Sequence, residues 1–214
     1  MSIQVIFNSA QSIELDRRKI VGQTVSRSER IRTAERASAN AFKFVIEPVS
    51  RFRYSLVRGV LESIMTPDRH TEQTVNIATT PGLWYLTQYL GDCSSAQLGT
   101  MSISAFTNTS VTLNNLPSIG SSLKLFRAGD WIQPTWSRYP YIVTSDVNRG
   151  SGSLATATVH RSLITSEATT VTGAFYVGTA TSLKVVVTEL PTYKLIQRDW
   201  AEFTGQFTVV ESII

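Results

Sequence analysis

The sequence predicts a mostly β protein that has one packed α-helix and a small inserted β-barrel. Alternation of apolar and polar residues in Ala41–Glu47 and Ser182–Leu190 is typical of strands that bury one face. Only Tyr54–Met65 has a convincing helical spacing. Between Thr100 and Thr165, short alternating runs are separated by turn-rich pieces. We therefore expect a discontinuous β domain, residues 1–100 and 167–214, interrupted by a small β-barrel, residues 101–166.

The amino-terminal part is expected to be extended. Residues 2–7 read as a short strand, and residues 13–36 as a long, twisted hairpin, because Thr24 and Val25 lower helix propensity and the apolar positions fit no 3.6-residue period. In Ala41–Glu47 the apolar face consists of Phe42, Phe44 and Ile46, and Pro48 ends the strand.

The predicted helix, Tyr54–Met65, carries an apolar stripe, and Ser55 is a candidate for its N-cap. The stripe consists of Leu56, Val57, Val60, Leu61 and Ile64. Beyond the helix, we expect Glu72–Ile77 and Leu83–Leu90 to form strands, or a strand and a short helix, and Gly91–Gly99 to form a loop.

The carboxyl-terminal part resumes long β patterning. Leu183, Val185 and Val187 share one side of Ser182–Leu190, and further strands are predicted at Tyr193–Ile196 and Phe203–Glu211. We expect the first and last segments of the chain to pair in one sheet, with the helix covering it.

Composition points to a globular chain that contacts other subunits. Of 214 residues 42% are hydrophobic and only 17% are charged, which leaves much neutral surface. The net charge of +4 is local, because Glu14–Arg58 contains eleven Lys or Arg and five Asp or Glu. Such a field can face nucleic acid, a membrane surface or an acidic neighbouring subunit. The single cysteine, Cys93, indicates folding in a reducing cytosol, and no signal peptide or membrane span is apparent.

Catalytic and metal chemistry lack the residues that they need. The only histidines, His70 and His160, are far apart in sequence, and no phosphate-binding or zinc-hydrolase motif occurs. Asp130, Asp146 and Asp199 would form a calcium or glycosidase site only if the fold gathered them, and we interpret them as turn-forming or salt-bridged residues. The sequence therefore predicts a protein that is not an enzyme and binds no cofactor or metal.

A cluster of aromatic residues lies in the predicted barrel. It follows the turn at Gly129-Asp130 and consists of Trp131, Trp136, Tyr139 and Tyr141. Such residues form either a sugar-binding surface or the core of a small barrel, and we favour the core.

The basic run in the predicted hairpin alternates with acidic residues. Because alternating charge suits pairing with a copy of the same hairpin better than nucleic-acid binding, we interpret it as an inter-subunit element. The residues concerned are Arg17, Arg18, Lys19, Arg27, Glu29, Arg30, Arg32, Glu35 and Arg36.

Three stretches resemble the small β-rich tail and baseplate proteins of long-tailed bacteriophages, a class that includes tail-tube, tube-initiator and distal-tail subunits. The first runs from SIELDRRK through ERASANAFKFVIEPVSRFRYSLVRGVLESI. The second is FRAGDWIQPTWSRYPYIVTSDV with VHRSL, and the third is LPTYKLIQRDWAEFTGQFTVVESI. Together they cover well over half of the chain.

The resemblance implies a tail-tube-like antiparallel β-barrel or sandwich, and a structural subunit of the virion tail that is assembled in the host cytoplasm. It also implies a ring, usually a hexamer, that meets other tail and baseplate proteins and the tape-measure protein, and that touches passing DNA transiently and without sequence specificity. No membrane insertion is expected. The alternatives are a carbohydrate-binding or receptor-binding virion module built on the aromatic cluster and, third, a glycan-cleaving enzyme built on the scattered carboxylates.

Overall fold

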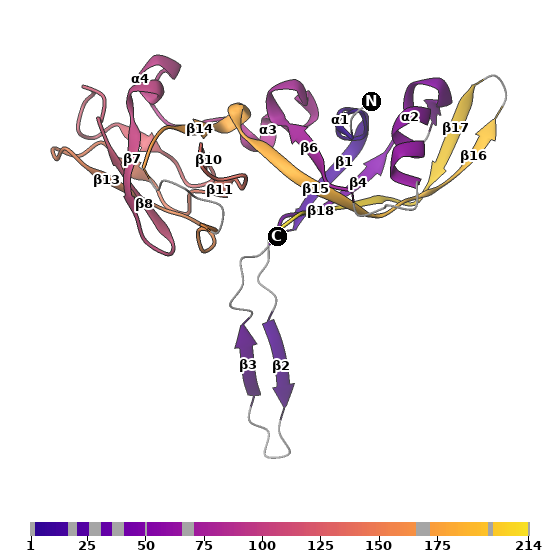
Figure 1. The fold of residues 1–214 in the computed structure, drawn as a ribbon, viewed down its shortest axis with the longest axis horizontal. Coiled ribbons are helices and arrows are strands. Elements are labelled where there is room, and N and C mark those ends of the chain that lie inside the picture. Colours follow the sequence, from indigo (N-terminus) through magenta and orange to yellow (C-terminus); the bar gives the residue numbers. More distant parts are fainter. Residues whose placement is uncertain are drawn as a thin grey trace.

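The computed structural model of the chain describes residues 3–16, 21–25, 31–35, 41–49, 51–65, 71–165, 172–196 and 199–213. Side chains are described at these positions except at 21–25, 31–35, 60 and 63–65. Figure 1 shows three parts: the insert at the left, a larger sheet with its helices at the right, and a hairpin that extends from the middle. The fold is mostly β, as predicted.

Within the described residues, the larger sheet has five strands and is called the main sheet. Its order is β1 (Ala10–Asp16), β4 (Lys43–Pro48), β18 (Phe207–Glu211), β15 (Ser182–Glu189) and β6 (Gln73–Asn76), and every neighbouring pair is antiparallel. The first and last segments of the chain therefore pair in one sheet, as expected.

One face of the main sheet is buried because apolar residues alternate along its strands. Phe44 of β4 lies opposite Leu15 of β1 and Val209 of β18 in the strand register. Phe44, Val209 and Val185 are fully buried. They belong to the main core, a cluster that also takes residues from the first helices and from Trp131. Each buried side chain of this size contributes about 1.5–3 kcal/mol.

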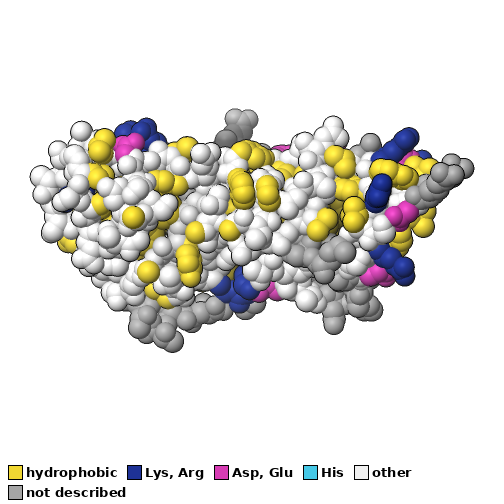
Figure 2. Space-filling model, turned by 90° about the horizontal axis from the view of Figure 1, so that it is seen from above, with side chains coloured by type: hydrophobic (Ala, Val, Ile, Leu, Met, Phe, Trp, Pro, Cys, Tyr) yellow, Lys and Arg dark blue, Asp and Glu magenta, His cyan; other side chains and the backbone are white. Residues whose placement is uncertain are grey.

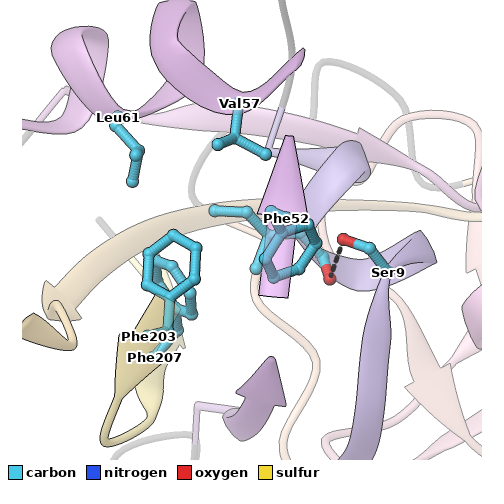
Figure 3. Close-up of a pocket in the computed structure, with 7 residues that line it drawn as sticks. Ser9, Phe52, Val57, Leu61, Phe203 and Phe207 are labelled. Atoms are coloured by element: carbon cyan, nitrogen blue, oxygen red, sulfur yellow. Dashed lines mark hydrogen bonds between the residues drawn. The ribbon is translucent and has the colours of Figure 1, made fainter. Parts of the chain in front are cut away.

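Helix α2 (Tyr54–Met65) confirms the predicted helix and its bounds. Val57 and Leu61 are buried, but Leu56 is 59% exposed, so its place in the predicted apolar stripe was wrong. Figure 3 shows Val57 and Leu61 pointing from α2 toward Phe52 and Phe203. The space between them, about 10 Å³, holds at most one water molecule, so this contact is packing and leaves no ligand site.

A second sheet of the described residues, the side sheet, consists of β16 (Thr192–Ile196), β17 (Trp200–Thr204) and β5 (Arg51–Arg53), and Figure 1 shows β16 and β17 beside α2. It corrects the prediction of one strand over Phe203–Glu211, because the chain turns at Gly205, where φ is +103°. β17 before this turn belongs to the side sheet, and β18 after it to the main sheet. A positive φ is tolerated by glycine, which lacks a Cβ.

The segment predicted as a strand at residues 2–7 forms helix α1 (Gln4–Asn8) instead. Ile3, Ile6 and Phe7 are all at most 4% exposed, and their i, i+3, i+4 spacing puts them on one helical face against the main core. Tertiary burial overrides local β propensity here.

Further short helices correct the prediction of one packed helix, and one of them confirms the expected alternative of a strand and a short helix in Glu72–Ile77 and Leu83–Leu90. Helix α3 (Trp84–Thr87) follows the 3₁₀ turns Ile77–Thr79 and Pro81–Leu83, and a third such turn is Gly178–Ala180. Helix α4 (Ser95–Thr100) occupies part of the predicted loop Gly91–Gly99. It starts with a capping box, in which Ser94 and Gln97 each bond to the other's backbone N–H.

The insert contains three small open sheets where a closed barrel was predicted. No sheet of the described ranges closes into a barrel. The larger domain is therefore not the β-barrel that was one of its two predicted forms. The insert sheets are β13 (Ala155–Thr158) with β8 (Ser110–Asn114) and β7 (Ser102–Phe106), β12 (Val147–Asn148) with β9 (Lys124–Phe126), and β11 (Tyr141–Ile142) with β10 (Trp131–Pro134) and β14 (Phe175–Val177).

These strands are too short, and too often interrupted by turns, to continue their hydrogen bonds around a closed ring. They share one apolar cluster, the insert core, which includes Leu113, Phe126 and Tyr141. Cys93 and Phe175 of β14, which lie outside the range predicted for the insert, residues 101–166, also contribute to this core.

The hairpin predicted over residues 13–36 is present in part, as β2 (Val21–Val25) and β3 (Ile31–Glu35), whereas residues 13–16 belong to β1 of the main sheet. The two strands pair antiparallel, with Val21 opposite Glu35 and Val25 opposite Ile31. Among the described residues they form a sheet of their own, and Figure 1 shows this sheet standing away from the main sheet and the insert.

Candidate functional site

The insert and the main sheet are joined by a buried ion pair. The side chains of Arg161, in the insert, and Glu211, on β18, are only 1% and 0% exposed. Arg161 donates from Nη1 to Oε2 of Glu211 at 2.5 Å and from Nη2 to Oε1 at 2.7 Å. This bidentate geometry gives strong, directional hydrogen bonds between the two charges.

Backbone groups add two further hydrogen bonds to this pair. Nη2 of Arg161 also donates to the carbonyl of Pro140 at 2.9 Å, and the N–H of Phe42 donates to Oε2 of Glu211 at 3.0 Å. A buried pair of charges is tolerated only when such additional bonds offset its loss of water. The pair is therefore part of the packed interior.

Aromatic rings surround the guanidinium of Arg161. Its central carbon lies 4.9 Å from the ring centre of Phe42, 5.2 Å from that of Tyr141 and 6.0 Å from that of Tyr139. The Phe42 ring also stacks on Trp131, with ring centres 4.9 Å apart. Cation–π contacts are stronger when the cation has lost its water, as here.

Further polar contacts cross the same junction. The backbone N–H of Ser182, on β15, donates to Oε1 of the buried Gln133 at 2.8 Å. Arg138 of the insert forms an ion pair with Glu72, just before β6. We call these contacts, with the Arg161–Glu211 pair, the junction.

The aromatic cluster predicted from the sequence lies mostly in the interior. Trp131, Tyr139 and Tyr141 are at most 1% exposed, and Trp136 is half-buried with its ring 5.8 Å from that of Phe106. Burial raises the pKa of Tyr141, whose hydroxyl accepts a hydrogen bond from the N–H of Ile164. The three buried rings present no sugar-binding platform.

The three aspartates considered for calcium or glycosidase chemistry accept hydrogen bonds from different parts of the chain. Asp130 is buried and accepts from the N–H groups of Leu90 and Arg127, each at 2.7 Å. Its burial raises the pKa of this carboxyl. Asp146 accepts from Lys124 and from the N–H of Ala128, and these contacts lower its pKa.

Asp199 lies apart from them, at the start of α2. It accepts from the N–H of Ser55 at 2.8 Å and from the Ser55 hydroxyl, while its own carbonyl accepts from the N–H of Tyr54 at 2.7 Å. Asp199 thus caps the helix that Ser55 was expected to cap. Across the described ranges no three His, Cys, Asp or Glu side chains are grouped as metal ligands.

The two histidines are not brought together by the described part of the chain. His70 lies outside it. The Nδ1 atom of His160 accepts from the N–H of Ile142 at 3.0 Å, and its ring stacks on Phe42 at 5.0 Å. The imidazole also lines an open hollow with Ala128, Gly129, Val143 and Thr144, where the side chains offer neither a carboxylate nor a thiol.

Most of the charged residues proposed as an inter-subunit element lie outside the described residues: Arg17, Arg18, Lys19, Arg27, Glu29, Arg30 and Arg36. Arg32 and Glu35 lie on β3, opposite Thr24 and Val21 of β2. The backbone therefore places these two charges on the hairpin, as expected.

The side sheet carries an exposed apolar group at the end of the molecule. Leu195 is 62% exposed, Trp200 41% and Ile196 37%, and the guanidinium of Arg53 lies 5.9 Å from the Trp200 ring centre. Figure 2 shows several charged and hydrophobic side chains gathered at this right-hand end, where α2, β16 and β17 lie in Figure 1. An exposed apolar group of this kind marks a candidate contact surface.

The junction was missed by sequence reasoning, although one signal pointed to it. Phe207, Val209 and Glu211 share strand parity, so a carboxylate is expected on a buried face and requires a partner. Nothing local identifies Arg161 as that partner, because it lies 50 residues earlier in the chain.

Comparison of the chain with models of protein families and with curated proteins found no match. Among the helices that the structure describes, none is long and apolar enough to cross a membrane.

Proposed function

We propose that the protein is a structural subunit of a bacteriophage tail, which forms part of a ring in the tail tube or baseplate hub through which DNA passes. It does no chemistry in this role. The observation that carries the proposal is the charged β2–β3 hairpin, whose strands pair with each other and with no other described strand.

An isolated two-stranded ribbon is marginally stable in water. Ordering each backbone residue costs about 1–2 kcal/mol, and a hairpin with few bulky apolar residues recovers little of that cost through burial. A neighbouring subunit supplies the missing contacts if the hairpin lies on it. The sequence resemblance to tail and baseplate proteins supports the same interpretation.

The charges of the hairpin suit such a neighbour. Arginine side chains bind carboxylates through two parallel hydrogen bonds, so Arg27, Arg30 and Arg32 can pair with acidic groups of the next copy. Remaining positive charge would face passing DNA without reading its sequence. Partners of the ring on this proposal are further copies, other tail and baseplate proteins and the tape-measure protein, and its location is the virion tail.

Deleting Arg17–Glu35 tests the proposal. The remaining chain should fold, because β2 and β3 pair with each other and with no other described strand. It should fail to enter tails, as judged by negative-stain microscopy of lysates and by the protein content of purified particles. Normal tails that contain the truncated subunit would contradict the proposal.

A matched pair of variants separates the hairpin's charge from its geometry. Replacing Arg27, Arg30 and Arg32 together by glutamate should abolish incorporation. Replacing the same residues by lysine keeps the charge but loses bidentate pairing, so we expect reduced incorporation. Equal incorporation of both variants and wild type would show that the arginines play no part in assembly.

A further inference from the structure

Two strand edges of the molecule are open. β1 is an outer strand of the main sheet, and β16 is an outer strand of the side sheet. In the described part of the chain, no strand pairs with the outer side of either. An open edge presents unpaired N–H and C=O groups in a row, which is a ready template for a strand from another molecule.

The opposite edges of these two sheets are short or partly covered. The carbonyl of Asn76, on the outer strand β6, accepts from the side-chain amide of Gln4 at 3.2 Å and from the Thr80 hydroxyl at 2.6 Å. β5 has three residues and leads directly into α2. β1 and β16, with seven and five residues, are longer than β6 and β5, the outer strands on the opposite sides of the same two sheets.

The β16 edge lacks the protection that soluble proteins usually give such strands. Edges are commonly blocked by lysines or prolines. The single charged residue on β16 is Lys194, which forms an ion pair across to Glu202 of β17 at 2.6 Å. Its neighbours on the strand, Leu195 and Ile196, are exposed.

The two edges carry matching alternation. On β1, Ile13 and Leu15 face the main core, opposite Ile46 and Phe44 of β4, so Glu14 lies on the other face. On β16, Tyr193 packs near Phe203, with ring centres 5.6 Å apart. Leu195 shares the face of Tyr193, and Lys194 lies on the opposite one.

We infer that β16 of one copy pairs antiparallel with β1 of the next, with Lys194 opposite Glu14 and Leu195 opposite Ile13. This register also puts Tyr193 opposite Leu15, so that apolar residues share one face and the opposite charges share the other. Cross-strand pairs of both kinds stabilise antiparallel strands. A parallel pairing with Lys194 opposite Glu14 would place Ile196 opposite Asp16.

The contact joins two different surfaces, so it is heterologous, and repeating it generates a ring if the rotation closes. The inference rests on the proposed function, in that it names the surfaces through which copies of a ring subunit meet. It does not involve the β2–β3 hairpin, whose contacts would add to it.

Cysteine cross-linking of the full chain tests the pairing. A variant with both Glu14→Cys and Lys194→Cys should form a covalent ladder on mild oxidation that ends at the closed ring. Each single variant should stop at the dimer or remain a monomer. Cys93 is buried, and the wild-type chain serves as the control for its reactivity.

The register is tested by a second pair of variants. Ser12→Cys with Ile196→Cys should cross-link, whereas Asp16→Cys with Ile196→Cys should not. The reverse result would overturn the antiparallel register.

A substitution of the exposed Leu195 tests the pairing independently, through its effect on self-association. Leu195→Lys should weaken self-association at least about tenfold in sedimentation, because it adds a charge to the open edge. Leu154→Lys, at a similarly exposed leucine of the insert, should leave association unchanged. Equal association of both variants would overturn the inference.

The outcomes distinguish this inference from the proposed function. Rings or tails that form normally while the Glu14→Cys, Lys194→Cys chain does not cross-link would overturn the edge pairing and leave the proposed function standing. A wild-type chain that enters no ring or tail would overturn both.

Discussion

The junction and the β2–β3 hairpin both concentrate charge, but they do so in opposite surroundings. At the junction, Arg161 and Glu211 are almost fully enclosed, and each charge has its partner and further backbone bonds within the same chain. In the hairpin, each strand pairs with the other and with no further described strand. The charges of the junction are thus paired within the chain, whereas on the proposed function those of the hairpin pair with a neighbouring subunit.

The difference indicates which parts of the molecule move together. The junction ties the insert to β18, β15 and β6 through directional contacts, so the insert and the main sheet should behave as one body. The hairpin has no comparable attachment among the described residues. Substitutions at the junction should therefore change folding stability, and substitutions in the hairpin should change assembly.

The largest loss of stability is expected from a substitution in the main core. Leu61→Asp replaces a side chain that is 2% exposed and places a charge among Phe52, Phe203 and Phe207. Lost burial and the unpaired charge together should lower the free energy of unfolding by about 5 kcal/mol or more, enough to prevent folding. Circular dichroism and solubility of the variant would show whether it folds. Leu56→Asp, on the same helix at an exposed position, is the control and should fold normally.

Breaking the junction should have the next largest effect. Arg161→Met leaves the carboxylate of Glu211 buried without its cation, which should lower the free energy of unfolding by about 3–5 kcal/mol. Urea denaturation measures this. Combining Arg161→Met with Glu211→Gln removes both charges and keeps an acceptor for the Phe42 N–H, so it should recover most of the loss. A single variant as stable as the wild type would contradict the internal pairing.

A smaller effect is expected at the cap of α2. Asp199 has φ of +69°, a conformation that Asp and Asn adopt more readily than other non-glycine residues. Asp199→Ala loses the bonds to Ser55 and keeps the unfavourable φ, so we expect a loss of about 1–2 kcal/mol in thermal or urea unfolding. Asp199→Asn should lose less. An alanine variant of unchanged stability would show that the cap adds nothing.

The smallest effect on stability is expected from the hairpin. The chain without Arg17–Glu35 should keep its urea midpoint within the equivalent of about 0.5 kcal/mol, the range usual for surface changes. A marked loss of stability would mean that the hairpin contacts its own body, and the contrast with the junction would fail.

The spacing of apolar residues correctly predicted the elements in which the residues of one regular face are buried. The α2 bounds and the β4 and β15 faces follow from apolar spacing alone, because Val57, Phe44 and Val185 are buried as their spacing demands. The helix α1 was mistaken for a strand because five residues show too little periodicity for a decision. β17 and β18 were predicted as one strand over Phe203–Glu211 because Phe203, Phe207 and Val209 share strand parity across Gly205.

The candidate site was less predictable, since its partners are distant in sequence. Arg32 and Glu35 were placed on a hairpin from composition and propensity. The junction depends on contacts between residues 161 and 211 and between residues 42 and 211, which no local pattern reveals. The aromatic cluster was found, but its position beside Arg161 was not.

The position of β18 in the main sheet has a consequence for how the chain folds as it is made. This strand lies between β4 and β15, although it follows all other described strands in the sequence. Until residues 207–211 have left the ribosome, β4 has no neighbour on that side and Arg161 has no carboxylate. Contacts that span 169 residues, such as Phe42 with Glu211, form slowly because the closing loop is long. The nascent chain therefore cannot complete its main sheet, or the buried ion pair of the junction, until its last strand has been made.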